Sequence, residues 1–211
     1  MSRLRELAYE EMNAEQRAMH DRLISGPRGR IAGPYVAWLR NARLADVAEQ
    51  YGRFVRYETS LPARLSEMAI LIVGRHWNAQ VEWWAHHPLA LKAGLDPAIA
   101  DAILHRRRPV FVHADEETVY DLTMELIETK KVGDATYRRA LDLFGETALI
   151  ELIAILGNYF AVALVLNTFE IMPPDGSSPM PTAAKALPMA ICGRMAAPRP
   201  SSRFSAFRLP P

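Results

Sequence analysis

The stretch that decides the fold runs from Ser66 to Gly94 and reads SEMAILIVGRHWNAQVEWWAHHPLALKAG. It holds two carboxylates, three histidines and three tryptophans among mostly apolar residues. Its first part, about residues 62 to 77, has an apolar run that suits a helix buried on all sides. Its second part, about residues 78 to 93, ends before Gly94, a typical residue just beyond a helix. Titratable groups in such a buried helix pair are places where catalytic chemistry is easily built.

Three side chains of this stretch are expected to meet. Glu82 and His86 are four residues apart, so they share one face of the second helix and can touch. Glu67 lies in the first helix at the rim of its apolar run. Pro88 removes a backbone hydrogen bond and should kink the helix beside the histidines. We therefore expect two adjacent antiparallel helices on which both carboxylates and His86 converge at one pocket.

Three segments carry a family resemblance, and they read Leu65-x-Glu67-Met-Ala-Ile-Leu, Ala79-x-x-Glu82-x-x-x-His86 and Leu89-Ala90-x-x-Ala93-Gly94-Leu95. They resemble the carboxymuconolactone decarboxylase family, whose wider superfamily includes the AhpD alkylhydroperoxidases. The peroxidase branch has a glutamate followed by Cys-x-x-Cys-x-x-x-His. Glu67 matches that glutamate and His86 the histidine, while Ala79 and Glu82 stand at the two cysteine positions. The resemblance extends more weakly over residues 14–171.

That resemblance implies an AhpD-like multi-helix bundle that assembles into homo-trimers or homo-hexamers. The periodicity of the chain independently favours an all-α fold, since no strand-like alternation flanked by turn signals occurs. Further helices are expected at about residues 14–23, 35–40, 44–57, 97–105, 115–131, 135–144 and 146–170. Asn13 with Gln16 forms a capping-box pattern, Asp96 precedes a proline suited to a first turn, and Gly145 separates the last two helices.

Length and charge indicate one helical domain, over residues 1–175, followed by a tail over 176–211. The chain has 211 residues, half of them apolar, and a net charge of +1, which predicts no nucleic-acid partner. The tail carries five basic residues and no acid, so residues 1–175 have 20 basic against 24 acidic residues. Nine of the 15 prolines lie from Pro173 onward. We therefore expect the tail to be disordered.

Three features bear on compartment and redox chemistry. Cys192 is the single cysteine, which excludes an intrachain disulfide and a Cys-x-x-Cys centre. The N-terminal stretch has no apolar core of the signal-peptide type, so a cytoplasmic location is expected. The longest apolar run, 152–166, would span only ~22 Å as a helix, short of a ~30 Å hydrocarbon layer. It is interpreted as a buried helix, and no membrane partner is expected.

Five further residues are weaker candidates for substrate binding. Arg28 lies in a Gly-Pro-Arg-Gly loop, and a guanidinium is a natural partner for a substrate carboxylate, although a surface arginine is the commoner outcome. Trp83 could line a pocket, and His87 could lie just behind its lining, but a position in the packed core is an equally good interpretation of each residue. Asn158 and Tyr159 are polar groups inside an apolar helix and need partners if they are buried.

A metal site is one alternative, because Glu67, Glu82, His86 and His87 could be drawn as ligands. Helical di-iron sites use Glu-x-x-His spacings from two helices. The single Glu-x-x-x-His of this chain is off that spacing and is not repeated. We therefore expect neither a metal nor another cofactor.

The leading hypothesis is a cofactor-free lyase (decarboxylase) or isomerase acting on a small carboxylated lactone or enolisable acid, as the resemblance implies. Glu82 and His86, hydrogen-bonded to each other, would deliver a proton as a general acid pair, and Glu67 would orient His86. A second class, thiol peroxidase, needs a thiolate and a resolving thiol that this chain lacks. A third class is a non-catalytic helical oligomer that binds a small ligand. Turnover assays separate the first class from the third.

Overall fold

The computed structural model describes residues 2–181, and within that range all of the regular secondary structure is helical. The predicted all-α fold is thereby confirmed. Residues 182–211, with Cys192 and most of the expected tail, lie outside the described range. A short 3-10 turn, Tyr9–Glu11, precedes eight α-helices, which are α1 Ala14–Ser25, α2 Tyr35–Trp38, α3 Ala42–Tyr57, α4 Ala63–Trp77, α5 Gln80–Lys92, α6 Pro97–Leu104, α7 Ala114–Thr129 and α8 Asp134–Thr168.

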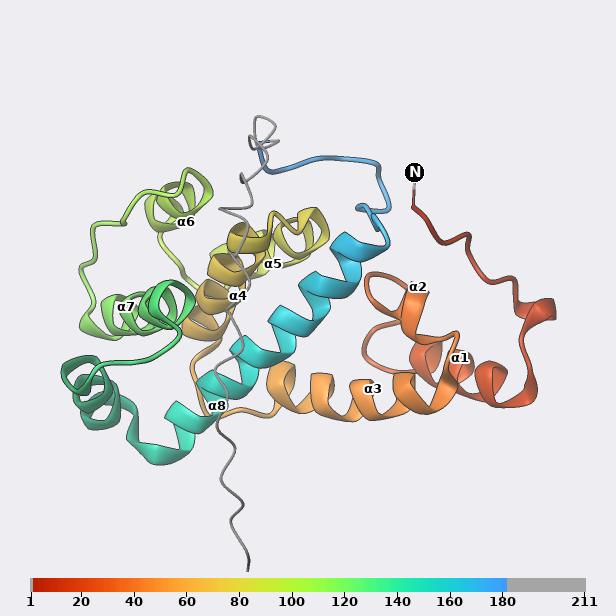
Figure 1. Cartoon of the computed structure of the whole chain (residues 1–211), viewed down its shortest axis with the longest axis horizontal. Coiled ribbons are helices and arrows are strands. Elements are labelled where there is room, and N and C mark those ends of the chain that lie inside the picture. Colours follow the sequence, from red (N-terminus) through yellow and green to blue (C-terminus); the bar gives the residue numbers. More distant parts are fainter. Residues whose placement is uncertain (1, 182–211) are drawn as a thin grey trace, which may run out of the picture.

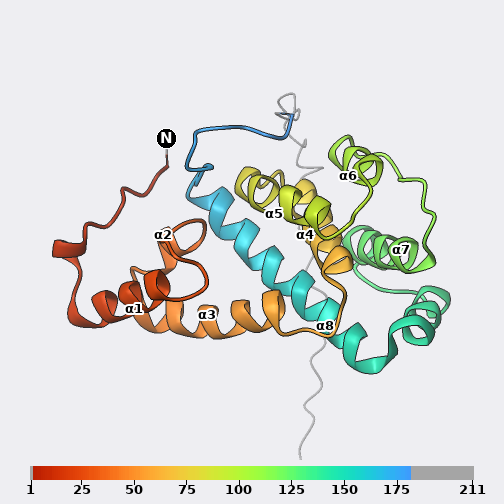
Figure 2. The ribbon, with the colours of Figure 1, turned by 180° about the vertical axis from the view of Figure 1, so that it is seen from behind.

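The helices are arranged around α4 and α8. In Figure 1, α8 crosses the molecule diagonally, with α1, α2 and α3 on one side and α6 and α7 on the other. The view from behind shows the same division, with α5 beside α4 (Figure 2). Helix α4 packs most extensively against α8 and α5. The stretch from Ser66 to Gly94, which holds most of α4 and all of α5, therefore forms the centre of the fold.

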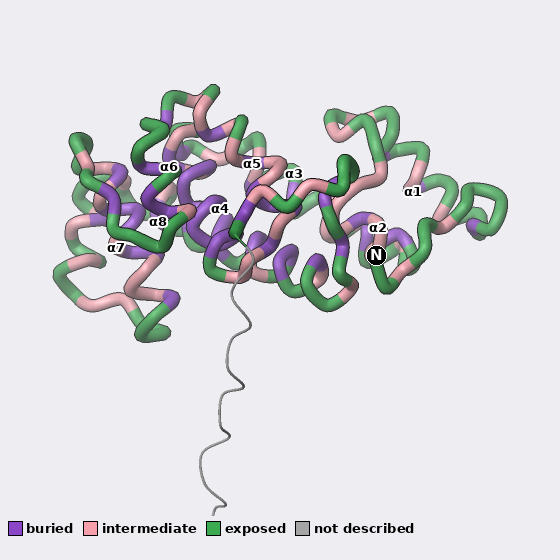
Figure 3. Tube along the Cα trace, turned by 90° about the horizontal axis from the view of Figure 1, so that it is seen from above, coloured by how far each residue is buried: buried purple, intermediate pink, exposed green. Residues whose placement is uncertain are grey.

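Helix α4 is buried because its apolar residues cover its whole circumference. Ten of its 15 residues are buried, and the tube view shows most of the helix in purple (Figure 3). Asn78 ends it in the left-handed conformation, with φ of 53°. The backbone then turns directly into α5, which packs back against α4.

Gly74 on α4 allows α4 and α5 to approach closely at the position of Glu82. A Cβ atom at this position would lie 3.0 Å from Cβ of Glu82, closer than real Cβ contacts normally allow. The absence of a side chain at Gly74 therefore lets Glu82 sit directly against α4.

Several predicted helix boundaries are confirmed by their capping contacts. Asn13 and Gln16 each accept a hydrogen bond from the other's backbone N–H, both at 2.9 Å. The Asp96 carboxylate accepts the N–H of Ala98 at 2.8 Å at the start of α6. Gly145, with φ of 73°, interrupts α8 at the predicted break. Pro88 lies inside α5, which continues beyond it to Lys92.

Helix α8 is the one described helix that is long and apolar enough to cross a membrane by length and composition. Half of its most apolar window is buried inside the fold, and the Gly145 break divides the helix. Because it packs along α4 and α7, it is described as the core helix of the bundle.

The chain remains packed beyond the expected domain boundary at residue 175. Met180 is only 1% exposed and belongs to the main core cluster. Gln80 Nε2 donates to the Met180 carbonyl at 3.2 Å, and the Met180 N–H donates to Gln80 Oε1 at 2.9 Å. Residues 176–180, assigned to the tail by composition, therefore return to α5 because one buried methionine anchors them.

Candidate active site

His86 is held from the neighbouring helix by Glu67. The His86 Nδ1 atom lies 2.7 Å from Glu67 Oε2, and both residues are buried. A carboxylate at this distance accepts the Nδ1–H, which fixes the ring and leaves Nε2 free to gain or lose a proton. The predicted meeting of these residues on two adjacent helices is confirmed. Their catalytic role stays a prediction.

Glu82 faces the other ring nitrogen without bonding to it. Its Oε2 lies 3.6 Å from His86 Nε2, which is too long for a hydrogen bond. The same oxygen has no hydrogen-bond partner among residues 2–181. The expected hydrogen bond between Glu82 and His86 is therefore not formed, because Glu67 determines the position of the ring. A buried carboxyl oxygen without a partner is unusual and points to a functional role.

Burial raises the pKa of Glu82 above the usual value near 4.5, and the neighbouring charges of His86 and Arg56 offset this only in part. The neutral carboxylic acid is therefore favoured at pH values where an exposed glutamate has begun to ionise. In that form Glu82 is a proton donor. A neutral acid beside an imidazole is a combination that enzymes use for general acid catalysis.

A cavity of about 520 Å³ opens beside these groups. Its walls come from the loop between α1 and α2 and from α2, α3, α5 and α8. The side chains from α5 and α8 that bring titratable or amide groups to the cavity are Glu82, His86, Asn158 and Tyr159. Aromatic side chains form much of the remaining wall, namely Tyr35, Trp38, Tyr57 and Trp84. The size and the mixed lining suit a small organic molecule.

Asn158 and Tyr159, two weaker candidates, both line the cavity. The Tyr159 ring stands edge-on to His86, with 5.0 Å between the ring centroids. Burial raises the pKa of Tyr159 well above 10, so its hydroxyl stays protonated. Gly52 on α3 lies opposite, where a Cβ would be 4.0 Å from Asn158 Oδ1.

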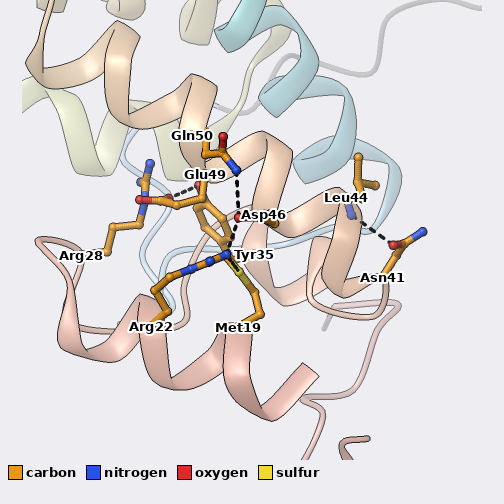
Figure 4. Close-up of polar contacts among 9 residues, drawn as sticks. All are labelled: Met19, Arg22, Arg28, Tyr35, Asn41, Leu44, Asp46, Glu49 and Gln50. Atoms are coloured by element: carbon orange, nitrogen blue, oxygen red, sulfur yellow. Dashed lines mark hydrogen bonds and ion pairs between the residues drawn. The ribbon is translucent and has the colours of Figure 1, made fainter. Parts of the chain in front are cut away.

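Arg28 also lines the cavity, but its side chain is already engaged. Its Nε donates to Glu49 Oε2 at 2.5 Å, and the same oxygen accepts the Tyr35 hydroxyl at 2.6 Å (Figure 4). The guanidinium lies 4.7 Å from the centre of the Tyr35 ring. Arg28 therefore fastens the loop between α1 and α2 to α3. Because its guanidinium already contacts Glu49 and Tyr35, Arg28 is less suited to bind a substrate carboxylate.

Trp83 and His87 lie away from the cavity. Trp83 is 3% exposed within the main core cluster, and His87 stacks on it with 5.6 Å between ring centroids. The next residue, Trp84, lines the cavity in place of Trp83. A shift of one residue turns a side chain by ~100° around a helix, so the choice between the two tryptophans depends on packing.

Two cavity residues, Arg30 and Arg56, were not singled out from the sequence. Arg30 lies in the same loop as Arg28, whose glycines and prolines drew attention to the loop but not to a particular side chain. Arg56 follows Ala48 and Gly52 at intervals of four residues, so the three share one face of α3. This four-residue spacing of two small residues and an arginine is the sequence signal from which Arg56 could have been identified. In residues 2–181 no group of three His, Cys, Asp or Glu side chains is placed to hold a metal ion.

No protein-family model matches the sequence, and no curated protein matches it. Among solved structures, the chain is similar to an uncharacterized peroxidase-related protein from Ralstonia eutropha JMP134, described as an alkylhydroperoxidase AhpD core. The TM-score is 0.66 at 13% sequence identity, over 82% of this chain and 93% of that chain. This chain therefore has the AhpD-like fold.

Proposed function

We propose that this protein is a cofactor-free decarboxylase or isomerase that acts on a small carboxylated lactone or a related enolisable acid. The observation that carries the proposal is the buried His86, held by Glu67 on one side and facing the unpartnered Glu82 on the other. The motif resemblance to carboxymuconolactone decarboxylases supports it. We also propose that the protein acts in the cytoplasm on a small-molecule carboxylate or lactone.

The reaction would begin with cleavage of the bond between a substrate carboxylate and the carbon that carries it. Carbon dioxide leaves, and the electron pair of that bond moves into a conjugated carbonyl group to give an enolate. The enolate then takes a proton on carbon, which completes the decarboxylation without an oxidant or reductant. In an isomerisation, His86 Nε2 would accept a proton from a substrate carbon, and the resulting enolate would be reprotonated at another carbon.

The residues of the site match these needs. Glu82, kept neutral by burial, can give a proton to the carbon, and His86 can restore that proton through Nε2. Glu67 stabilises the imidazolium that forms when His86 is protonated. Protonated Tyr159 is a hydrogen-bond donor for the enolate oxygen, and preorganised donors of this kind stabilise developing charge. Arg56 is near enough to act on the pKa of both Glu82 and Tyr159 and adds positive potential at the reacting end.

A comparison of His86→Gln with His87→Gln tests the proposal. Glutamine keeps hydrogen-bonding capacity but cannot be protonated near neutrality, so His86→Gln should lower turnover by ~10²–10⁴. His87→Gln should have little effect, because His87 stacks on Trp83 outside the cavity. A substrate would first be found by a thermal-shift screen of small carboxylates and lactones, since a ligand of the folded state raises the melting temperature. Equal losses in the two variants would contradict the proposal.

A peroxidase activity is the alternative that the similar structure's description raises. Peroxide reduction by thiols needs a thiolate and a second thiol to resolve the oxidised sulfur. This chain has Ala79 and Glu82 where the AhpD pattern has cysteines, and Cys192 is its single thiol. We therefore disfavour peroxidase activity. A non-catalytic small-ligand oligomer would show binding in the same screen with no turnover of any ligand that binds.

A further inference from the structure

Arg30 occupies a distinctive place at the cavity. It lines the cavity and is exposed, with its guanidinium 5.2 Å from the centre of the Trp84 ring. Arg28 is paired with Glu49, whereas Arg30 has no ion pair or side-chain hydrogen bond within residues 2–181. Arg30 is therefore a cation at the cavity whose N–H groups remain available.

Trp84 is held in place by the segment that follows α8. Its Nε1–H donates to Asp175 Oδ2 at 2.8 Å, and Asp175 Oδ1 accepts the Ser177 N–H at 2.9 Å. The same segment is fastened to Gln80 through the two hydrogen bonds of Met180. Gln80 and Trp84 are four residues apart and share one face of α5, so residues 171–180 pack against that face. Figure 1 shows this segment running from the end of α8 back toward α5.

This arrangement favours binding of a carboxylate by Arg30. An indole whose N–H donates to a carboxylate has a more electron-rich ring, which strengthens its attraction for a cation on its face. A guanidinium that stacks on a ring uses its flat face, so its edge of N–H donors stays free for the two oxygens of a carboxylate. The ring thus fixes the arginine without competing for its hydrogen bonds.

We propose that Arg30, stacked on Trp84, binds a substrate carboxylate that is remote from the reacting carbon, and that Asp175 is the positioning residue for this pair. The proposal names the anchoring group of the substrate and in that respect rests on the proposed function. It assigns the anchoring role to Arg30 in place of Arg28. It also gives residues 171–180 a role at the site, because they contain Asp175 and are held against α5 by the hydrogen bonds between Met180 and Gln80.

Binding of a matched pair of probes tests this proposal without any need for turnover. The probes are 4-fluorobenzoate and 4-fluorobenzamide, which have nearly the same shape but differ in charge, and ¹⁹F NMR titration reports the affinity of each. The wild type should bind the benzoate at least about tenfold more tightly, the scale of one charge-assisted hydrogen-bonded pair. Arg30→Gln should remove most of this preference by weakening benzoate binding and leaving benzamide binding unchanged.

Two further variants test the positioning role of Asp175. Asp175→Ala and Trp84→Phe each remove one end of the indole hydrogen bond, so each should lower benzoate affinity, and the double variant should lose no more than the worse single variant. Arg107→Gln is the matched control, because Arg107 is an exposed arginine that pairs with Asp101 and does not line the cavity. It should leave both affinities unchanged.

Three results would overturn the proposal. The first is a wild type with no preference for the benzoate. The second is an Arg30→Gln variant that loses both probes equally, which would make Arg30 only a wall of the cavity. The third is a larger benzoate-specific loss in Arg28→Gln than in Arg30→Gln. Failure of the chemistry would show separately, as equal turnover in the His86 and His87 variants.

Discussion

Replacing Glu82 with glutamine should make the protein more stable and less active at the same time. Glu82 is 4% exposed, and its Oε2 has no hydrogen-bond partner within residues 2–181. Glutamine has nearly the same shape but cannot ionise. The substitution therefore removes the cost of keeping a carboxyl group buried and removes its transferable proton. Many active sites carry groups whose loss stabilises the fold in this way.

The size and sign of the stability change follow from the raised pKa of Glu82. Between the pKa of glutamate in the unfolded chain and the higher pKa in the folded protein, the folded state binds more protons. The free energy of unfolding of the wild type should then fall as the pH rises through this window, by up to about 1.4 kcal/mol per pH unit. Glu82→Gln should lack this slope. For a chain of this size, each 1 kcal/mol corresponds to roughly 2–4 °C in melting temperature.

The assay is urea unfolding of both proteins at a series of pH values from 5 to 8, with turnover measured at the same values. We expect the stability advantage of Glu82→Gln to grow with pH and its turnover to fall by ~10²–10⁴. Glu67→Gln is the matched control, because Glu67 accepts a hydrogen bond from His86 and its replacement should destabilise the fold. Parallel pH profiles for the wild type and Glu82→Gln would refute the reasoning.

Three other outcomes are expected. Gly74→Ala should cost ~1–3 kcal/mol in urea unfolding, because its methyl group would meet Cβ of Glu82 at 3.0 Å; unchanged stability would contradict the close packing of α4 and α5. We propose that the chain self-associates as a trimer or hexamer through the exposed apolar face of α3, which consists of Leu44, Val47, Tyr51 and Phe54. Val47→Glu, at a position 61% exposed, should then lower the mass seen by light scattering, whereas Val110→Glu, at a position 90% exposed in a loop, should not; a monomeric wild type would refute this. Peroxide with a dithiol should give no turnover, and turnover that Cys192→Ser abolishes would overturn our view of the site.

The central helices and their pairing could be predicted from the sequence because the signals there are local. The apolar run of α4 continues around the whole helix, and the capping residues Asn13 and Asp96 mark helix starts through contacts that span two or three residues. The four-residue spacing of Glu82 and His86 fixes the face that they share. The composition of the tail was a poorer guide, since one buried methionine, Met180, holds residues that composition alone assigned to disorder.

The rest of the site depends on contacts between segments that lie far apart in the sequence. Spacing alone could not show that His86 bonds to Glu67, 19 residues away, and leaves Glu82 unpaired. Nor could it show which tryptophan faces the cavity, because that depends on where the loop between α1 and α2 packs. Arg30 and Arg56 were missed for the same reason, since neither a loop arginine nor one at the edge of a helix face shows from the sequence alone which other segments pack beside it.

The two ends of the cavity differ in charge and exposure, and this difference would orient a bound substrate. The proposed proton donors lie at the inner wall, where burial keeps Glu82 neutral, while Arg30 lies exposed and stacked on Trp84. Under the proposed function, a negatively charged substrate would therefore meet a cation where water still screens charge and would place its reacting carbon beside the buried Glu82 and Tyr159. In the proposed reaction, loss of a carboxylate at the inner wall would create an enolate there, and Arg56 and Tyr159 would stabilise its charge until Glu82 supplied the proton. The Glu82 carboxyl, whose Oε2 has no hydrogen-bond partner within residues 2–181, is thus costly to the fold, and in the proposed reaction the same lack of a hydrogen bond leaves its proton available to the substrate.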